Sequence, residues 1–281
     1  MPKKALIAGC GYVGCELAAR LVRDGHDVYG LRRNVGALPA GVWPVEADLA
    51  DASTLDDLPR GLDVIFYTAS SDASSEQAYR RAYVDGLRNV IEALSTAGSL
   101  PGRLIVTTST AVYGQDRGEW VDETSETAPE GFQGRVLLES ERLATSTEME
   151  SVVVRFGGIY GPGRTRLIDS VRRGEAAVPD RPAYTNRIHR DDCAGVLRHL
   201  MGLPAPERVY LGVDDEPADR RDLITWLAAE LGAPQPPLET RSGPSGKRCR
   251  NARLVATGYA FEYPTFRQGY AAVLADLPSS P

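Results

Sequence analysis

Three glycines near the start of the chain have the spacing of a phosphate-binding turn. Gly9, Gly11 and Gly14 stand in GCGYVG, directly after a short apolar run. Glycine permits the tight turn at Gly9 and close approach of a ligand at Gly11, and it lets a following helix pack closely at Gly14. A pyrophosphate would then meet the free N–H groups at the start of that helix. The motif predicts a dinucleotide site; the alternative is a merely tight turn.

Two arginines stand where the second half of such a site would lie. About twenty residues after the glycines, an acidic side chain would bind the ribose 2′-hydroxyl of NAD. The chain has DVYGLRRN there, with Arg32 and Arg33 and no carboxylate. Guanidinium groups pair well with phosphate oxygens. We therefore expect NADP as the cofactor, with NAD as the second choice and a solvated arginine pair as the alternative.

The elements that must position these residues alternate along the first part of the chain. Strands are expected at 5–9, 27–31, 42–47, 63–68, 102–108 and 151–156, and helices at 12–23, about 74–97 and 131–144. Apolar runs between amphipathic helices are typical of a parallel sheet covered on both faces. We predict an α/β fold of Rossmann type, with a doubly wound parallel sheet.

The pattern loosens after residue 157, where glycine and proline turns separate short helices. A helix from Asp192 and a strand at 208–213 are expected to return to the sheet. The predicted dinucleotide-binding domain therefore comprises 1–156 and 188–213, and the smaller, irregular substrate-binding portion comprises 157–187 and 214–281.

The net charge, the length of the apolar runs and the cysteine count exclude some kinds of partner and predict the compartment. The 281 residues carry a net charge of −6, which argues against a nucleic-acid or anionic-membrane partner. No apolar run has the length of a signal peptide or a membrane span, so a cytoplasmic protein is expected. Four cysteines without Cys-x-x-Cys spacing and three histidines predict neither a disulfide framework nor a metal site. Cys10 is interpreted as a small buried thiol.

Further motifs give the chain a family resemblance. VEADLAD, DVIFYTAS, TTSTAVYG, RFGGIYGPGR and IHRDD follow one another in order. With them the chain resembles the extended short-chain dehydrogenase/reductase family, which includes sugar-nucleotide epimerases and dehydratases. The resemblance runs from about residue 4 to 278. It is specific for the fold and not for one reaction.

The resemblance implies roles for particular residues. Asp48 would contact the adenine, Ala69 and Ser70 would border the cofactor, and the hydroxyl of Ser109 would bind a substrate carbonyl. The full set of expected cofactor contacts is Gly9, Gly11, Tyr12, Val13, Gly14, Arg32, Arg33, Asp48, Leu49, Ala69, Ser70 and Thr107.

The family's catalytic Tyr-x-x-x-Lys pair is missing. Glu139 fits the glutamate that the family carries on this helix, and counting back from it places Gly131 and Arg135 at the two positions. A register two residues later places Gln133 and Leu137 there. Since positioned acid–base catalysis contributes roughly 10²–10⁴ in rate, another group would have to move the proton.

Four residues are candidates for the role of the missing catalytic pair. Each could instead be a packed or capping residue. Tyr113 reaches it only if the chain turns back after Ser109, while Tyr160 and His189 lie on loops expected on the substrate side. Arg135 could hold a ribose or a phosphate but cannot act as a base, because it stays protonated.

Other features allow two interpretations each. Lys247, Arg248, Arg250 and Arg253 would bind a phosphate or carboxylate of the substrate, or pair with surface acids. Helices 74–97 and 133–149 could form a homodimer interface or simply pack on the sheet. Asp191 and Asp192 are expected to cap a helix, as are Asn251 and Thr265.

Two functions follow from these residues. The first is an NADP-dependent oxidoreductase or epimerase-like enzyme acting on a small polar or nucleotide-linked carbonyl or hydroxyl substrate, with Ser109 orienting the reacting oxygen. The second is a non-catalytic dinucleotide sensor, which the missing Tyr-Lys pair favours. The retained Ser109 and substrate-side loops favour the enzyme.

Overall fold

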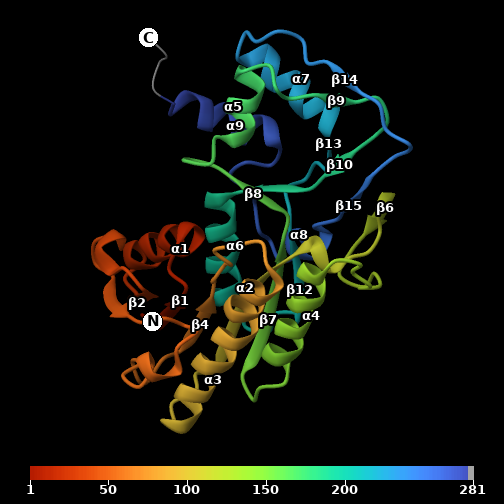
Figure 1. Ribbon diagram of the computed structural model, residues 1–281. Helices are drawn as coiled ribbons and strands as arrows, with labels where there is room; N and C mark the ends of the chain where they lie inside the picture. Colours follow the sequence, from red (N-terminus) through yellow and green to blue (C-terminus); the bar gives the residue numbers. More distant parts are fainter. Residues whose placement is uncertain (278–281) are drawn as a thin grey trace. The chain divides into compact units, whose positions relative to one another are not determined.

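The computed structural model describes residues 1–277 and contains a seven-stranded sheet (Figure 1). Its strands are β1 (Lys4–Ala8), β2 (Asp27–Arg32), β3 (Trp43–Glu46), β4 (Val64–Tyr67), β5 (Arg103–Ser109), β7 (Glu150–Phe156) and β12 (Val209–Gly212). They lie in the order β12-β7-β5-β4-β1-β2-β3, and the pairs between β5 and β3 are parallel. The order reverses beside β1, which is the switch point of a doubly wound sheet. The predicted Rossmann-type sheet is confirmed.

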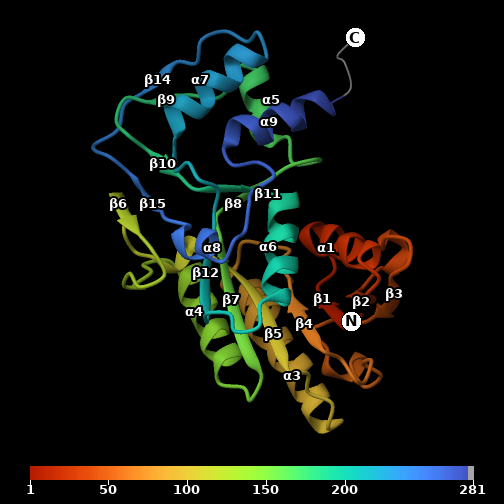
Figure 2. The same cartoon turned by 180° about the vertical axis from the view of Figure 1, so that it is seen from behind.

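The central strands are mostly apolar, as a sheet covered by helices on both faces requires. Figures 1 and 2 show α3 (Gly86–Thr96) and α4 (Phe132–Thr145) on one face, and α1 (Tyr12–Arg23) and α6 (Arg190–Gly202) on the other. All residues of β4 are buried, and Ile65 and Tyr67 belong to the same apolar cluster as residues of α3. The α3 residues of this cluster are Leu87, Val90 and Leu94. A strand buried on both faces reads as a continuous apolar run, which is why these elements were visible in the sequence.

The helix expected over 74–97 is interrupted. It consists of α2 (Glu76–Arg80), a π-helical turn (Arg81–Asp85) and α3. The hydroxyl of Tyr67, on β4, donates to the Ala82 carbonyl at 2.5 Å, and the N–H of Gly86 bonds the Arg81 carbonyl instead. A side chain inserted into the hydrogen-bond ladder is a known cause of such a bulge. A Cβ at Gly86 would lie 2.5 Å from the Tyr67 hydroxyl, so glycine is required there.

The chain divides into two compact units. The first contains residues 1–113, 127–155 and 194–210, and the second contains 114–126, 156–193 and the residues from 211 on. The expected division differs mainly at 114–126 and 188–193. The first of these segments carries β6 (Arg117–Val121), which pairs with β15 (Gly246–Cys249) of the second unit. The second begins within β11 (Arg187–His189), which pairs with β8 (Gly158–Tyr160).

The second unit is built from short elements around its own core. Three helices, α5 (Arg166–Arg172), α7 (Arg220–Glu230) and α9 (Phe266–Ala275), enclose Leu223, Leu227 and Phe266. The remaining elements are β9 (Val178–Pro179), β10 (Tyr184–Thr185), β13 (Ala218–Asp219), β14 (Leu238–Glu239) and α8 (Ala252–Ala256).

Two expected helix caps have different outcomes. The Thr265 hydroxyl accepts from the N–H of Arg267 and caps α9, as predicted. Asn251 precedes α8, but its side chain does not cap that helix, so this prediction was wrong. Its amide instead donates to the carbonyl of Val213 and to the Asp215 carboxylate. Within residues 1–277, no helix has the length and apolar character needed to cross a membrane.

Candidate functional site

The glycine turn lies where β1 and β4 end side by side. Gly9 has φ +85°, and a Cβ there would come within 2.5 Å of the Ala69 backbone. A Cβ at Gly14 would lie 2.9 Å from Oγ1 of Thr68, which donates to the Gly9 carbonyl at 3.0 Å. Only glycine fits these positions. Thr68 holds the turn in place and was missed in the sequence, although its hydroxyl directly after a buried strand was a usable signal.

The turn leaves the start of helix α1 open to an anion. Gly11 precedes the helix, no side chain caps it, and the first turn holds no acidic residue. A Cβ at Gly11 would meet only the Gly9 carbonyl, at 3.8 Å, so the backbone there is approachable. A helix start without a side-chain cap, together with the helix dipole, suits a pyrophosphate. The residues present therefore fit a dinucleotide.

The two arginines after β2 have different surroundings. Arg32 is partly buried, and its Nη1 donates to the Cys10 carbonyl at 3.2 Å, so its guanidinium lies on the glycine turn. Arg33 is exposed and forms an ion pair with Asp72 at 2.7 Å, which raises the pKa of Arg33. Arg32 thus contacts the loop, whereas Arg33 already has a carboxylate partner that sequence reasoning missed.

The other expected cofactor contacts follow the carboxyl ends of the strands, where ligands bind in this fold. After β3, the Asp48 carboxylate accepts from the N–H of Ala50, and the Leu49 carbonyl accepts from Asn89. Thr107 of β5 donates to the Tyr67 carbonyl at 3.2 Å. Of the remaining contacts, Tyr12 and Val13 begin α1, Ala69 is partly buried and Ser70 is exposed.

A short 3₁₀ turn separates Ser109, at the end of β5, from Tyr113. The hydroxyl of Ser109 accepts from the N–H of Ala111 at 3.2 Å and opens a 3₁₀ turn over Thr110–Val112. Tyr113 follows this turn and is buried. Its hydroxyl accepts from Nη1 of Arg155 at 2.8 Å, and the guanidinium lies 5.1 Å from the ring centre.

Arg155 belongs to a buried polar network that links β5, β7 and α4. Its Nε and Nη2 donate to the Glu141 carboxylate at 3.0 and 2.7 Å, and Thr108 donates to the same carboxylate at 2.8 Å. Burial acts to lower the pKa of Arg155, but the hydrogen bonds and charge of Glu141 outweigh it and raise that pKa. Glu139 is more exposed and pairs with Arg80. The buried glutamate of α4 is therefore Glu141.

Arg135 lies on the exposed face of α4. Its Nη1 donates to the carbonyl of Glu130, in the segment that leads into the helix. Gly131 is the residue before the helix starts at Phe132. Both residues belong to the first unit, as do Ser109 and Tyr113, whereas Tyr160 and His189 belong to the second unit.

Tyr160 lies in an aromatic stack of the second unit. Its ring is 4.4 Å from that of Tyr270 and 5.3 Å from that of His189. The Tyr160 hydroxyl has no hydrogen-bond partner among residues 1–277 and packs against Gly269. Burial, with the nearby Asp214 charge, raises the pKa of Tyr160.

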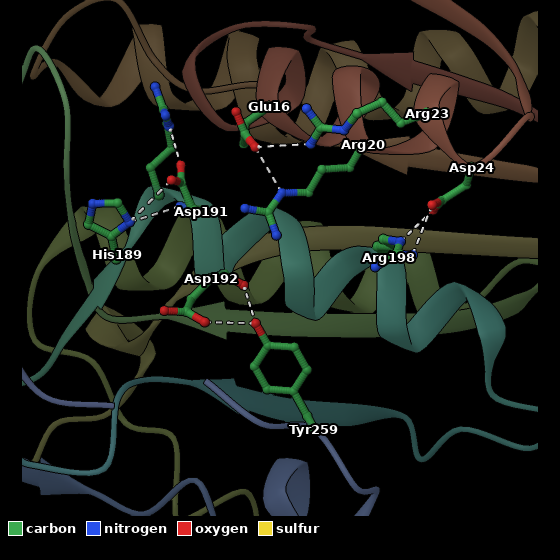
Figure 3. Close-up of polar contacts among 10 residues, drawn as sticks. Glu16, Arg20, Arg23, Asp24, His189, Asp191, Asp192, Arg198 and Tyr259 are labelled. Atoms are coloured by element: carbon green, nitrogen blue, oxygen red, sulfur yellow. Dashed lines mark hydrogen bonds and ion pairs between the residues drawn. The ribbon is translucent and has the colours of Figure 1, made fainter. Parts of the chain in front are cut away.

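His189 and Asp192 fix the chain around the start of α6 (Figure 3). Nδ1 of His189 accepts from the N–H of Asp191 at 3.2 Å. Asp192 lies in the first turn of α6, which begins at Arg190. Its buried carboxylate accepts from the Tyr259 hydroxyl and from the N–H groups of Glu262 and Tyr263, at 2.8 to 2.9 Å. Asp192 therefore anchors the C-terminal segment.

The predicted basic cluster is only partly paired with acids. The Arg248 guanidinium lies 4.8 Å from the Trp120 ring centre and 4.7 Å from that of Tyr184. The Arg250 guanidinium lies 4.7 Å from the same Trp120 ring, which is 45% exposed. Arg253 instead faces Glu123 at 3.8 Å. Burial lowers the pKa of Lys247.

The sheet and glycine turn define a dinucleotide-binding protein of the Rossmann class. The family model "NAD dependent epimerase/dehydratase family" matches residues 5–185, and the chain belongs to that family within the extended short-chain dehydrogenase/reductase superfamily. A structure described as an NAD-dependent epimerase/dehydratase from Methylobacillus flagellatus is 38% identical, with a TM-score of 0.84 over 98% of both chains. Among the described residues, no three His, Cys, Asp or Glu side chains gather as metal ligands.

More distant relatives extend the comparison to named enzymes. The 3-diazoavenalumate denitrifying reductase of Streptomyces sp. is 26% identical over 95% of this chain and 98% of its own length. The human epimerase family protein SDR39U1, solved with NADPH, is 20% identical with a TM-score of 0.80 over 98% of this chain and all of its own. Other structures of this fold contain NAD. The relatives named reductases and dehydrogenases support an oxidoreductase-like protein.

Proposed function

We propose that this chain is an NADP-preferring oxidoreductase. The observation that supports it most directly is the position of Arg32. Arg32 ends β2, where the family pattern for NAD would have a carboxylate, and its guanidinium lies on the glycine turn that follows β1. A ribose 2′-phosphate beside this guanidinium would gain a charge-assisted hydrogen bond. The 2′-hydroxyl of NAD carries no charge and would gain less from the same guanidinium. Arg32 therefore favours NADP.

Ser109 is proposed to bind the reacting oxygen of the substrate. The bound nicotinamide would supply or accept the hydride. The Ser109 hydroxyl stands at the carboxyl end of β5 and accepts its hydrogen bond from the N–H of Ala111. A hydroxyl has one donor and two acceptor positions, so its proton stays available for a carbonyl or hydroxyl oxygen. The same contact that ends the strand thus orients Ser109 as a donor.

The substrate is proposed to be polar, nucleotide-linked or otherwise anionic. This rests on the basic–aromatic cluster of the second unit, formed by Trp120, Tyr184, Arg248 and Arg250. Stacking on the rings holds both guanidiniums, and Nε of Arg248 donates to the Gly118 carbonyl. Planar guanidiniums held in this way present their N–H edges to phosphate or carboxylate oxygens.

The burial of the candidate proton donors favours a second function. Tyr113 is buried with its hydroxyl on Arg155, and the Tyr160 ring is stacked on Tyr270. The raised pKa of Tyr160 makes it a weaker acid than an ordinary tyrosine. A dinucleotide-binding protein without turnover, a sensor or regulator, is therefore the second candidate.

A titration tests the cofactor assignment. The protein, stripped of cofactor, is titrated with NADPH and separately with NADH, following fluorescence. Micromolar NADPH binding that is at least about tenfold tighter than NADH binding, equivalent to about 1.4 kcal/mol, is expected. Equal affinities would overturn the NADP preference. NADPH consumption with a panel of carbonyl compounds and sugar nucleotides then separates the enzyme from the sensor.

The homodimer remains a proposal with its own test. Within one chain, α2 and α4 already contact each other: the ring of Tyr79 lies 5.5 Å from that of Phe132, and Arg80 pairs with Glu139. The rest of these helices would have to form the interface. Light scattering of the purified chain should give twice the mass of 30.4 kDa; the monomer mass would exclude the dimer.

A further inference from the structure

Two thiols and a guanidinium gather at the glycine turn. Cys10 stands between Gly9 and Gly11 and is fully buried, while Cys15 lies in the first turns of α1 and is half-buried. The Cys15 thiol donates to the Cys10 carbonyl at 3.3 Å, and Nη1 of Arg32 donates to the Cys15 sulfur at 3.7 Å. The Cys15 sulfur also shares a hydrogen bond with the Cys10 thiol. The two sulfurs are therefore neighbours beside a fixed positive charge.

These surroundings favour a thiolate on Cys15. The hydrogen bond from Cys10 and the charge of Arg32 lower the pKa of Cys15, although partial burial acts in the opposite direction. The N-terminal end of α1 also favours a negative charge. The pKa of Cys10 is raised, because its thiol donates to Cys15 and is buried. Of the two thiols, Cys15 loses its proton first and Cys10 keeps its own.

We propose that Cys15 is a nucleophilic modification site and that hydrogen peroxide converts the Cys10–Cys15 pair into a reversible disulfide. The Cys15 thiolate attacks one peroxide oxygen, the O–O bond breaks, and the leaving hydroxide takes a proton to become water. Cys15 is then a sulfenic acid. The Cys10 sulfur attacks the Cys15 sulfur, the S–O bond breaks, and the hydroxyl leaves with the Cys10 proton as water. The two thiols lose two electrons, and the peroxide is reduced to two waters.

The other two cysteines have no such surroundings. Burial raises the pKa of Cys193 and raises that of Cys249 to about 12. A buried thiol that keeps its proton reacts slowly with a reagent from solution, because the thiolate is the reactive form. Cys10 differs only in that its reaction partner is the neighbouring Cys15 sulfur, whose leaving hydroxyl takes the Cys10 proton. They provide internal controls within the same chain.

The disulfide would act on the segment that meets a dinucleotide. It would join the two ends of Gly11–Gly14, whose backbone faces a pyrophosphate in this fold. It would also remove the negative sulfur from beside Arg32. We therefore expect the oxidised chain to bind a dinucleotide at least about tenfold more weakly, and bound NADPH to slow modification of Cys15. Only these two effects rest on the proposed cofactor.

Thiol chemistry without cofactor tests the pair directly. The full chain is treated with a limiting amount of iodoacetamide between pH 5.5 and 9, and peptide mass spectrometry gives the rate at each cysteine. Cys15 should react at least about tenfold faster than Cys193 and Cys249, and faster at pH 6.5 than a free thiol, whose pKa is about 8.5. Arg32→Gln should move its pH profile toward that of a free thiol. A Cys15 rate no faster than that of a free thiol at pH 6.5 would overturn the proposal.

Peroxide treatment tests the disulfide. Hydrogen peroxide should remove two free thiols per chain, a Cys10–Cys15 cross-linked peptide should form, and dithiothreitol should restore both thiols. Cys10→Ser should leave a Cys15 sulfenic acid that dimedone traps, Cys15→Ser should abolish the reaction, and Cys193→Ala should behave as wild type. Sulfinic acid at Cys15 without the cross-link would overturn the pairing. Since these readouts need no dinucleotide, they stand whichever way the NADPH titration falls.

Discussion

Arg155 and Glu141 form a bidentate ion pair inside the first unit, with only 7% and 8% of their side chains exposed. Two parallel N–H···O contacts, at 3.0 and 2.7 Å, join them, while Thr108 and Tyr113 occupy further hydrogen-bonding positions. Removing one partner of such a pair leaves the other charge buried and uncompensated, whereas replacing both with apolar groups costs much less. The pair therefore holds α4 against β5 and β7. Its main effect is the free energy lost when one partner is removed, and the net attraction between the two charges is smaller.

Glu141→Ala is expected to lower the free energy of unfolding by about 3–5 kcal/mol, because Arg155 would keep its charge in the core. The double variant Glu141→Leu/Arg155→Met should lose clearly less than Glu141→Ala alone. Urea unfolding followed by circular dichroism measures both. Glu139→Ala is the matched control on the same helix and should cost at most about 1 kcal/mol, since its pair with Arg80 is largely exposed. Similar losses for Glu139→Ala and Glu141→Ala would contradict this account.

The sheet was predictable because its strands are buried on both faces and their apolar runs are continuous. The hydrogen-bond and ion-pair partners of single side chains were not predictable. Glu139 and Glu141 lie two residues apart, and only Arg155, on a strand that follows in sequence, decides which of them is buried. If Glu141 is the family's helix glutamate, the register places Gln133 and Leu137 at the Tyr and Lys positions.

Long-range contacts account for the other differences. The π turn depends on the Tyr67 hydroxyl, which comes from a neighbouring strand rather than from the helix itself. Asp192 has the sequence position of a capping residue, but its carboxylate is taken by N–H groups about seventy residues later. Local spacing carries no information on such partners. The glycine turn was predictable since its requirement for glycine is set by the backbone.

Arg32→Asp should weaken NADPH binding by at least about 1.4 kcal/mol, or tenfold, while NADH binding changes little or improves. The physical reason is that a carboxylate repels the 2′-phosphate and accepts a hydrogen bond from a 2′-hydroxyl. Arg33→Asp is the matched control next to it. Because Arg33 is exposed and already paired with Asp72, its replacement should have the smaller effect. Isothermal titration with both nucleotides measures the ratio, and an unchanged ratio in Arg32→Asp would refute the assignment.

Arg248→Ala and Arg250→Ala should each weaken binding of inorganic pyrophosphate to the basic–aromatic cluster. Each removes a guanidinium that stacks on Trp120. Binding to the wild-type chain should fall as salt rises, because ions screen exposed charges. Arg253→Ala, whose guanidinium faces Glu123, should bind pyrophosphate as wild type does. Pyrophosphate also suits the start of α1, so the measurement is made with NADPH saturating. Equal binding by all four proteins would exclude the cluster as an anion site.

Asp214 should make the protein less stable as the pH rises toward 8. Burial raises the pKa of Asp214 to about 8, with the Arg187 charge acting against it, and Oδ2 has no hydrogen-bond partner within residues 1–277. The folded chain therefore holds a proton that the unfolded chain releases above its ordinary pKa of about 3.9. Stability from this group is complete below about pH 4 and is lost as the pH rises through 8, with a slope approaching 1.4 kcal/mol per pH unit, to order of magnitude.

Asp214→Asn, which cannot ionise, should flatten the profile of unfolding free energy between pH 5 and 8, whereas the exposed Asp57→Asn should keep it. Urea unfolding at several pH values provides the comparison, and an Asp214→Asn profile parallel to that of wild type would show that the carboxyl is ionised in the folded chain.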